Sequence, residues 1–356
     1  MSYSVPSAGN HAGIPRKPEM IFIIGAPRSG TTLLERMLSS HSQVLGGPEP
    51  HLITPLAHLG VWAKVDKAPY DPILSAEAQK LFVSRLPRGE KDYWDACRAY
   101  CDILYGRYLE AHGPDKRYCL DKTPAYALVL PFLARVYPDA RYVVITRHPI
   151  AMFASFAESF FDDDWEAAWR HNPLVERYVP AIAAFLRKEK PSRAHVRYED
   201  LVRQPESEFR RICDYLDLPF EPEAIEYGRR EQDSLHSQGL GDPTGVNRHQ
   251  RPTTKSVSKW VSALVNRPDR VELMRRALAA VSDEDLARIG HPRETLWKPW
   301  EEAGHTAPPV PRARLTRYRL ERKIIVRGRS VVQKWPALRR FLQRLRLFLD
   351  VLTREP

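Results

Sequence analysis

The sequence lacks several features that would place it in common protein classes. No run of about eighteen apolar residues without charges occurs in it, so the sequence predicts no membrane-spanning helix. The N-terminal residues 1–18 contain no apolar segment followed by a cleavage site, and they are expected to form a flexible leader. The cysteines are few, with no C-x-x-C pair and no histidine cluster at zinc spacing: Cys97, Cys101, Cys119 and Cys213. These absences predict a cytoplasmic protein with free thiols and no metal site.

Net positive charge is lacking from most of the chain and is concentrated at its end. The chain carries a formal charge of +11, and residues 312–356 contain fourteen Arg or Lys against three acidic residues, so this tail accounts for the whole excess. Since no aromatic-interleaved or groove-reading module accompanies the tail, we do not expect a nucleic-acid partner.

The segment 336–352 within this tail is predicted to form a basic amphipathic helix. Apolar residues follow helical spacing at Leu338, Phe341, Leu342, Leu345, Phe348 and Leu352, beside several arginines. Such a helix either lies on an anionic membrane surface, here the inner face of the membrane, or packs its apolar stripe on the body of the protein. Sedimentation with liposomes, with and without residues 312–356, distinguishes the two interpretations.

Short β-rich segments alternate with helical patterns along the body of the chain. The four predicted strands are rich in Ile, Val and Tyr and cover residues 20–24, 117–120, 141–146 and 194–197. This alternation predicts a three-layer α/β/α fold with a mainly parallel sheet. Residues 19–305 are expected to form the domain, and a Pro-rich hinge at 306–311 leads into the basic tail.

A helical insertion is predicted between the first two strands, at about residues 60–115. Its helical patterns cover residues 76–86 and 93–111, and the segment is too long for a simple crossover connection. Two interpretations fit the insertion equally: a lid or an element that binds a substrate, or additional helical packing.

Residues 23–32, IIGAPRSGTT, have the outline of a phosphate-binding loop that lacks its lysine. Gly25 and Gly30 have the P-loop spacing, but Thr31 stands where a nucleotide triphosphatase has lysine. Backbone amides at a helix start favour an anion there, and Arg28 is the cation of the loop. Hydroxyl groups come from Ser29, Thr31 and Thr32. The set suits a phosphosulfate, which carries less charge than a triphosphate; the alternative is an ordinary helix start capped by side chains.

Three motifs in this order resemble those of sulfotransferases that use 3′-phosphoadenosine 5′-phosphosulfate (PAPS). APRSGTTLL resembles the loop that binds the 5′-phosphosulfate in that family. The segment YVVITRHPIAMFASF resembles its 3′-phosphate motif, which implies that Arg147 and Ser155 bind the 3′-phosphate. An arginine at the carboxyl end of a parallel strand also suits bidentate phosphate binding on physical grounds, although such a residue often forms a salt bridge instead. The third motif is RYEDL at 197–201, where Tyr198 either contacts adenine or is a core tyrosine.

The same resemblance implies the groups that carry out the transfer. Glu49, in LGGPEPHLI, takes the place of the family's catalytic base, although Pro48 departs from the family's G-E-E pattern; the alternatives are a surface carboxylate, or His51 or His58 as the base. Lys122, in LDKTPAY, corresponds to the lysine that assists the leaving oxygen, or else forms a salt bridge with Asp121.

A late segment, TKSVSKW, completes the resemblance. It implies that Ser258 reaches the sulfate and that Lys259 binds phosphate, whereas Trp260 is expected to be a core aromatic. The catalytic set is therefore predicted to comprise Glu49, Arg28, Lys122 and Ser258, with no metal.

These observations predict an enzyme that transfers the sulfuryl group of PAPS to a hydroxyl group by in-line displacement. The acceptor is expected to be a carbohydrate, a glycolipid or a small metabolite, and a homodimer is compatible with the sequence. The alternatives are a P-loop kinase or NTPase, which the missing lysine disfavours, and a non-catalytic nucleotide-binding module.

Overall fold

The computed structural model describes two compact units whose segments alternate along the chain. The described residues are 16–47, 49–59, 72–229, 250–303 and 335. The first unit takes its described residues from 16–147, 180–254 and 288–290, and the second from 148–179, 255–287 and 291 onward. The leader lies almost wholly outside the described residues, as does the basic tail with its amphipathic segment 336–352, so the domain limits at 18 and 305 stay predictions.

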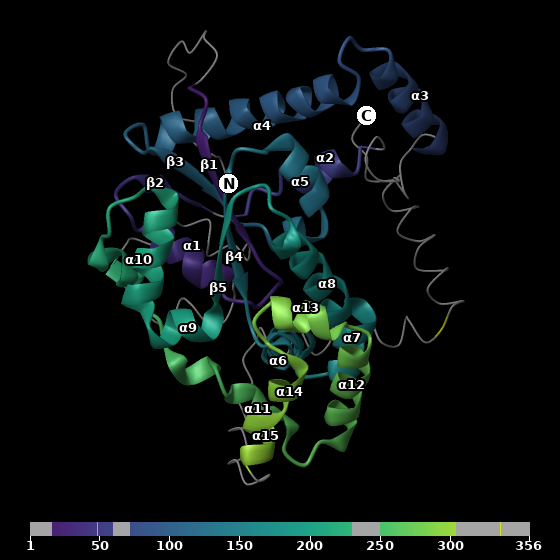
Figure 1. Cartoon of the computed structure of the whole chain (residues 1–356), viewed down its shortest axis with the longest axis vertical. Coiled ribbons are helices and arrows are strands. Elements are labelled where there is room, and N and C mark those ends of the chain that lie inside the picture. The colour runs from purple at the N-terminus through teal and green to yellow at the C-terminus, as the bar shows by residue number, and fades with distance from the viewer. Residues whose placement is uncertain (1–15, 48, 60–71, 230–249, 304–334, 336–356) are drawn as a thin grey trace, which may run out of the picture. The chain divides into compact units, whose positions relative to one another are not determined.

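A five-stranded, all-parallel sheet forms the centre of the first unit, with the strand order β2-β3-β1-β4-β5 (Figure 1). The strands are β1 (Glu19–Ile24), β2 (Val44–Leu45), β3 (Tyr118–Asp121), β4 (Arg141–Thr146) and β5 (Arg193–Arg197). Strands β1 and β4 are buried almost throughout, as expected for runs of Ile, Val and Phe in a sheet with both faces covered. The predicted α/β fold is confirmed, and the four predicted strands are present to within one residue.

Helices cover this sheet and build the insertion of the first unit. Their bounds are α1 (Thr31–Ser39), α2 (Ile53–Ala57), α3 (Pro72–Ser84), α4 (Glu90–His112), η1 (Pro124–Leu128), α5 (Leu130–Val136), α9 (Tyr198–Arg203), α10 (Pro205–Leu216), η2 (Pro222–Ile225) and η3 (Tyr227–Arg229). Helix α1 packs against β1 and β2, and α10 packs against β5. In Figure 1, α1 and α10 lie on one side of the sheet and α5 on the other. Both predicted helices of the insertion are present as α3 and α4, although residues 60–71 lie outside the described part.

The second unit consists of short helices. Its elements are α6 (Pro149–Phe161), α7 (Trp165–His171), α11 (Lys259–Leu264), α12 (Pro268–Ala279), α14 (Arg293–Leu296) and α15 (Lys298–Glu302). Helices α8 (Leu174–Arg187) and α13 (Asp283–Arg288) and the turn η6 (Thr254–Ser256) each run from one unit into the other. Helix α6 packs against α7 and α11. The Cζ atom of Arg270 lies 5.0 Å from the centre of the Trp165 ring, and the same guanidinium donates a hydrogen bond to the Asp163 carboxylate. Trp260 is buried and stacks on His148 at 4.5 Å, which confirms that it is a core aromatic.

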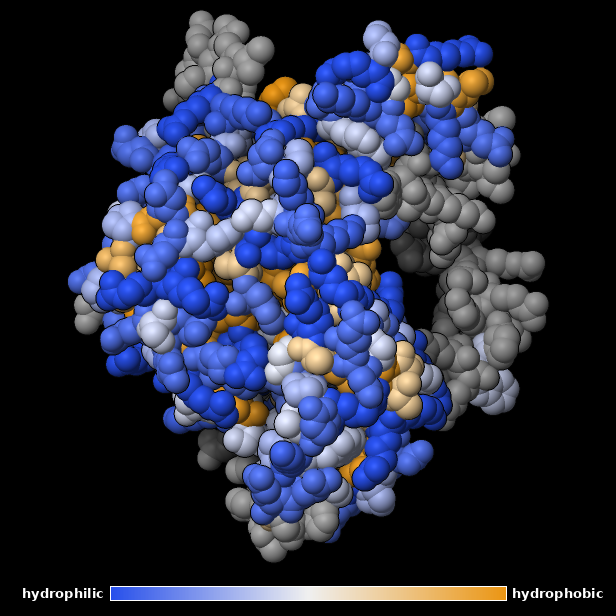
Figure 2. Space-filling model, in the orientation of Figure 1, coloured by the Kyte–Doolittle hydropathy of each residue, from blue (hydrophilic) through white to orange (hydrophobic). Residues whose placement is uncertain are grey.

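Exposed apolar side chains gather on the insertion. On α3 they are Leu81 and Phe82, and on α4 they are Tyr100, Ile103 and Leu104. Figure 2 shows the corresponding orange colour over α3. The apolar residues of α1 and α10 are buried by contrast, so these outward side chains distinguish the insertion from the helices that cover the sheet. Among the helices that the structure describes, none is both long enough and apolar enough to cross a membrane.

Candidate active site

Polar side chains follow the carboxyl ends of all five strands of the first unit. Glu49 comes after β2, Lys122 directly after β3, the loop of Arg28 after β1, Arg147 directly after β4 and Tyr198 directly after β5. Since all five strands are parallel, these ends share one edge of the sheet, where open α/β sheets bind ligands. The strand order therefore arranges the groups along the edge as a carboxylate, a lysine, the glycine loop, an arginine and a tyrosine.

The glycine loop turns sharply between β1 and α1. Arg28 and Gly30 both adopt left-handed backbone conformations, with φ of 70° and 93°. At Gly30 a side chain has no room as well, because a methyl group there would lie 2.5 Å from Cδ2 of Tyr198. Helix α1 begins at Thr31 with Gly30 as its N-cap, and glycine has no side chain that could cap the helix. The alternative of a helix start capped by Ser29 and Thr31 is not tested by this, and the binding of an anion by the first amide groups of α1 stays a prediction.

Lys122 and Glu49 contact each other beside the start of α1. The Lys122 Nζ atom pairs with Glu49 Oε1 and lies 3.4 Å from the Thr32 hydroxyl. Lys122 is almost fully buried, and the Glu49 side chain is 19% exposed. His51, whose φ is 53°, lies with Nε2 3.5 Å from the other carboxylate oxygen of Glu49. The structure thus brings the predicted base, the predicted lysine and the P-loop hydroxyl together, while Pro48 lies outside the described residues.

Asp121 does not form the salt bridge with Lys122 that was the alternative for that lysine. Its carboxylate is buried and accepts hydrogen bonds from three hydroxyl groups instead, those of Tyr105, Thr123 and Tyr126. Burial raises the pKa of Asp121 to about 6, although the three hydrogen bonds and the Lys122 charge act in the opposite direction. No local pattern in the sequence indicates this cluster, because Tyr105 approaches from the insertion helix α4.

The raised pKa of Asp121 predicts a specific pH dependence of stability. Between about pH 4 and pH 6 the native state holds a proton that the unfolded chain has released, so this carboxyl group stabilises the protein at low pH and that contribution is lost as the pH rises. Over this window the loss amounts to about 3 kcal/mol of unfolding free energy. We expect the free energy of unfolding, measured with urea at pH 4, 5 and 6, to fall more steeply with pH in the wild type than in Asp121→Asn. An equal pH dependence in the two proteins would contradict the prediction.

Arg147 and Tyr198 form the other end of the edge. The Arg147 guanidinium donates a 2.9 Å hydrogen bond to the backbone carbonyl of Arg28 and lies 4.4 Å from the centre of the Tyr198 ring. The ring of Tyr198 is buried against Gly30 and this guanidinium. Arg147 is therefore fixed to the glycine loop from one side and to Tyr198 from the other, and the predicted contact of Tyr198 with adenine stays a prediction.

The remaining predicted site residues belong to the second unit. Ser155 lies half-buried on α6, and Ser258 is exposed at the N-terminal end of α11. Lys259 forms an ion pair with Glu158 of α6, with nitrogen–oxygen distances of 2.5 and 2.7 Å. Their predicted roles in sulfate and phosphate binding stay predictions.

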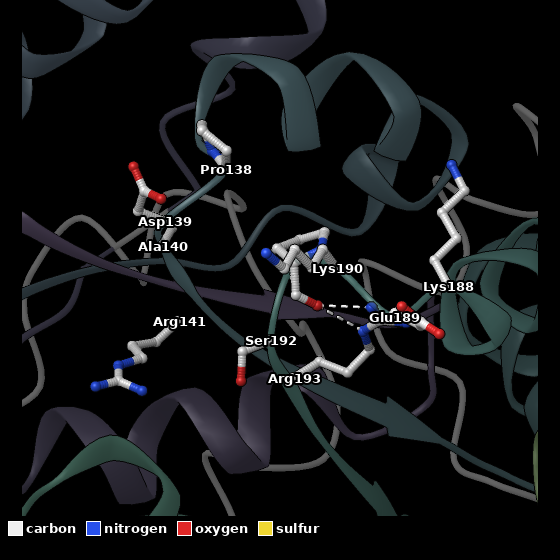
Figure 3. Close-up of a pocket in the computed structure, with 10 residues that line it drawn as sticks. Pro138, Asp139, Ala140, Arg141, Lys188, Glu189, Lys190, Ser192 and Arg193 are labelled. Carbon is white, nitrogen blue, oxygen red and sulfur yellow. Dashed lines mark hydrogen bonds between the residues drawn. The ribbon is translucent and has the colours of Figure 1, made fainter.

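A hollow of about 650 Å³ lies at the opposite, amino edge of the sheet, between the starts of β4 and β5 (Figure 3). Four basic residues line it: Arg141, Lys188, Lys190 and Arg193. The Arg193 guanidinium donates to the backbone carbonyl of Pro191 and also contacts that of Phe185. Arg193 therefore braces the loop that precedes β5, and none of the predicted site residues lines this hollow.

The thiols and the acidic and histidine side chains provide few further candidates. All four cysteines are buried free thiols, and burial raises the pKa of Cys101, Cys119 and Cys213 to about 12, so these are not activated nucleophiles. Within the described ranges, no three His, Cys, Asp or Glu side chains gather as a metal site would require. The predicted independence from metal is not tested by this finding.

The chain is similar to a family of known sequences, to individual relatives and to solved structures. A sequence model described as "Sulfotransferase family" matches residues 18–222. The chain is 28% identical over 304 residues to nodulation protein NoeE of Sinorhizobium fredii, covering 77% of this chain and 66% of that protein's length. It is 25% identical over 320 residues to protein-tyrosine sulfotransferase A of Caenorhabditis elegans, covering 84% and 77%. Among solved structures, a sulfotransferase domain from the curacin biosynthetic pathway aligns with a TM-score of 0.47 and 25% identity, over 74% of this chain and 98% of the other.

Proposed function

Since this chain belongs to the sulfotransferase family, we propose that it transfers the sulfuryl group of PAPS to a hydroxyl group of an acceptor. The observation that carries this proposal is the order of groups along the carboxyl edge of the sheet. Glu49 and Lys122 meet at one end of the glycine loop, and Arg147 is bound to its other end. A nucleotide with a 5′-phosphosulfate and a 3′-phosphate carries two anionic groups, one for each end of the glycine loop.

The glycine loop and α1 fit the 5′-phosphosulfate. The chain offers the first amides of α1, the hydroxyl groups of Thr31 and Thr32 and the cations Arg28 and Lys122, with no lysine inside the loop. This donor set matches an anion of modest charge. It matches a metal-bound triphosphate poorly, because the P-loop lysine that would neutralise the β- and γ-phosphates is missing.

Arg147 fits the 3′-phosphate. Its guanidinium is held in place by the carbonyl of Arg28 and the ring of Tyr198, so a planar fork is oriented before the ligand arrives. Both supports belong to the edge that also carries the glycine loop, which favours one nucleotide bound through both phosphate groups.

The proposed reaction is an in-line displacement at sulfur. Glu49 accepts the proton of the acceptor hydroxyl as the oxygen–sulfur bond forms, and the bond from sulfur to the bridging oxygen breaks. Lys122 and Arg28 stabilise the charge that grows on this bridging oxygen, which leaves with 3′,5′-ADP. Glu49 is paired with Lys122, so the bound anion competes with the base for the same lysine.

For the acceptor we propose a hydroxyl group of a carbohydrate, a glycolipid or a small metabolite. The protein-tyrosine sulfotransferases among the relatives make a tyrosine phenol the second candidate. Incubation with radiolabelled PAPS and a lysate, followed by identification of the labelled product, separates the two.

Calorimetry with two nucleotides tests the proposal itself. We expect 3′,5′-ADP to bind at least about tenfold more tightly than ATP with magnesium, since Arg147 gives the site a second anion contact that ATP cannot fill. A preference for ATP would instead favour a P-loop kinase or NTPase and overturn the assignment.

A further inference from the structure

A buried hydrogen-bond chain connects the two segments that carry the proposed base and the proposed lysine. Tyr126 donates to Asp121 Oδ2 at 2.9 Å, and its hydroxyl oxygen accepts from the backbone amide of Ile53 at 3.3 Å. Asp121 immediately precedes Lys122, and Ile53 begins helix α2 four residues after Glu49. Tyr126 and Ile53 are both fully buried, so water does not replace either bond readily.

We propose that Tyr126 is a positioning residue for sulfuryl transfer, whose hydroxyl group holds the segment of Glu49 against the strand end of Lys122. This inference rests on the proposed function. The hydroxyl uses both its proton and a lone pair, and each bond reaches a different segment of the site. The contact between the side chains of Glu49 and Lys122 also ties the two segments, but the reaction itself must open that contact.

Tyr105 provides the comparison that isolates this role. It donates to the same oxygen of Asp121, at 2.5 Å, and is also buried. It comes from α4, however, and its hydroxyl makes no hydrogen bond to the described part of the segment that carries Glu49. Removing either hydroxyl takes one hydrogen bond from Asp121, but only removal from Tyr126 also releases the amide of Ile53.

The expected effect falls on the chemical step and not on nucleotide binding. The proposed nucleotide-binding groups are Arg28, Lys122, Arg147 and the start of α1. The Tyr126 hydroxyl bonds to none of them, because its two hydrogen bonds go to Asp121 and Ile53. A displacement of the base by a fraction of an ångström lowers the rate steeply, since the reacting atoms must be aligned. The inference therefore predicts a fall in kcat with an unchanged KM for PAPS.

The experiment compares Tyr126→Phe with Tyr105→Phe in the full chain. The probe is the release of labelled sulfate from PAPS with water as the acceptor, together with calorimetry of 3′,5′-ADP and urea unfolding. We expect Tyr126→Phe to lower the saturating rate about 30-fold with KM and the Kd of 3′,5′-ADP within about twofold, and Tyr105→Phe to lower the rate no more than about threefold. Tyr126→Phe should lose more stability than Tyr105→Phe, because it also leaves the buried amide of Ile53 without its hydrogen-bond partner.

Three results would overturn the inference. Equal loss of rate in both variants would show that the hydroxyl groups act only through the stability of the cluster. A loss of 3′,5′-ADP affinity in Tyr126→Phe that matches the loss of rate would place its effect on binding. A wild-type protein that neither binds 3′,5′-ADP nor releases sulfate would overturn the proposed function, and this inference with it.

Discussion

Substitution of Glu49 by glutamine is expected to lower kcat about 1000-fold, the range that a general base contributes. Glutamine preserves the size of the side chain but cannot accept the proton of the acceptor. Binding of 3′,5′-ADP should not weaken, because the substitution frees Lys122 from its carboxylate partner and leaves a positive charge beside the glycine loop. Calorimetry with 3′,5′-ADP and initial rates at saturating PAPS measure the two quantities separately.

The two rival bases of the same segment supply the controls for this experiment. His58 is exposed, and its Nδ1 atom bonds to the carbonyl of Thr54, so His58→Gln should behave like the wild type. His51 contacts Glu49, and His51→Gln should therefore change the rate far less than Glu49→Gln does. Near-native turnover in Glu49→Gln, or an equal loss in His51→Gln, would remove Glu49 from the role of base.

The second large effect is expected at Arg147. Arg147→Ala should raise the Kd of 3′,5′-ADP about 100-fold, since it removes a charged, oriented fork from the proposed 3′-phosphate site. Binding of 5′-AMP, which lacks the 3′-phosphate, should change no more than about threefold. Arg147→Lys should give a Kd of 3′,5′-ADP between those of the wild type and Arg147→Ala. Lysine keeps the charge but loses both the planar guanidinium and its stacking on Tyr198.

The comparison of the two nucleotides distinguishes phosphate binding from a purely structural role. Arg147 also supports the carbonyl of Arg28, and a collapse of the glycine loop would weaken both ligands alike. Equal losses for 3′,5′-ADP and 5′-AMP would therefore contradict the assignment of Arg147 to the 3′-phosphate.

Local patterns in the sequence predict most of the fold. Runs such as MIFII and RYVVIT are strongly β-forming and buried, so β1 and β4 are visible without any knowledge of their neighbours. The two residues of β2 are too few to show any periodicity, and that strand is found only by its pairing with β3. The strand order depends on contacts between distant segments, so no local pattern in the sequence predicts it.

The candidate site is predictable to the extent that it lies next to strand ends. Lys122 and Arg147 each follow a strand directly, and this position alone places them at the ligand edge of a parallel sheet. That Lys122 pairs with Glu49 and not with its neighbour Asp121 is not predictable in this way. The outcome depends on Tyr105 and Tyr126, which surround Asp121 with hydroxyl groups from two other elements.

The bond from Tyr105 to Asp121 also bears on protein engineering. An insertion at the rim of an enzyme is a natural segment to exchange in chimeras that aim at new substrates, but here the C-terminal half of α4 is attached to the aspartate beside Lys122. A graft that replaces the whole of α4 would strip one donor from that buried carboxylate. The boundary of an exchanged segment should therefore lie before Cys101. This protein then keeps its own C-terminal turns of α4, and only the N-terminal part of the helix comes from the other protein.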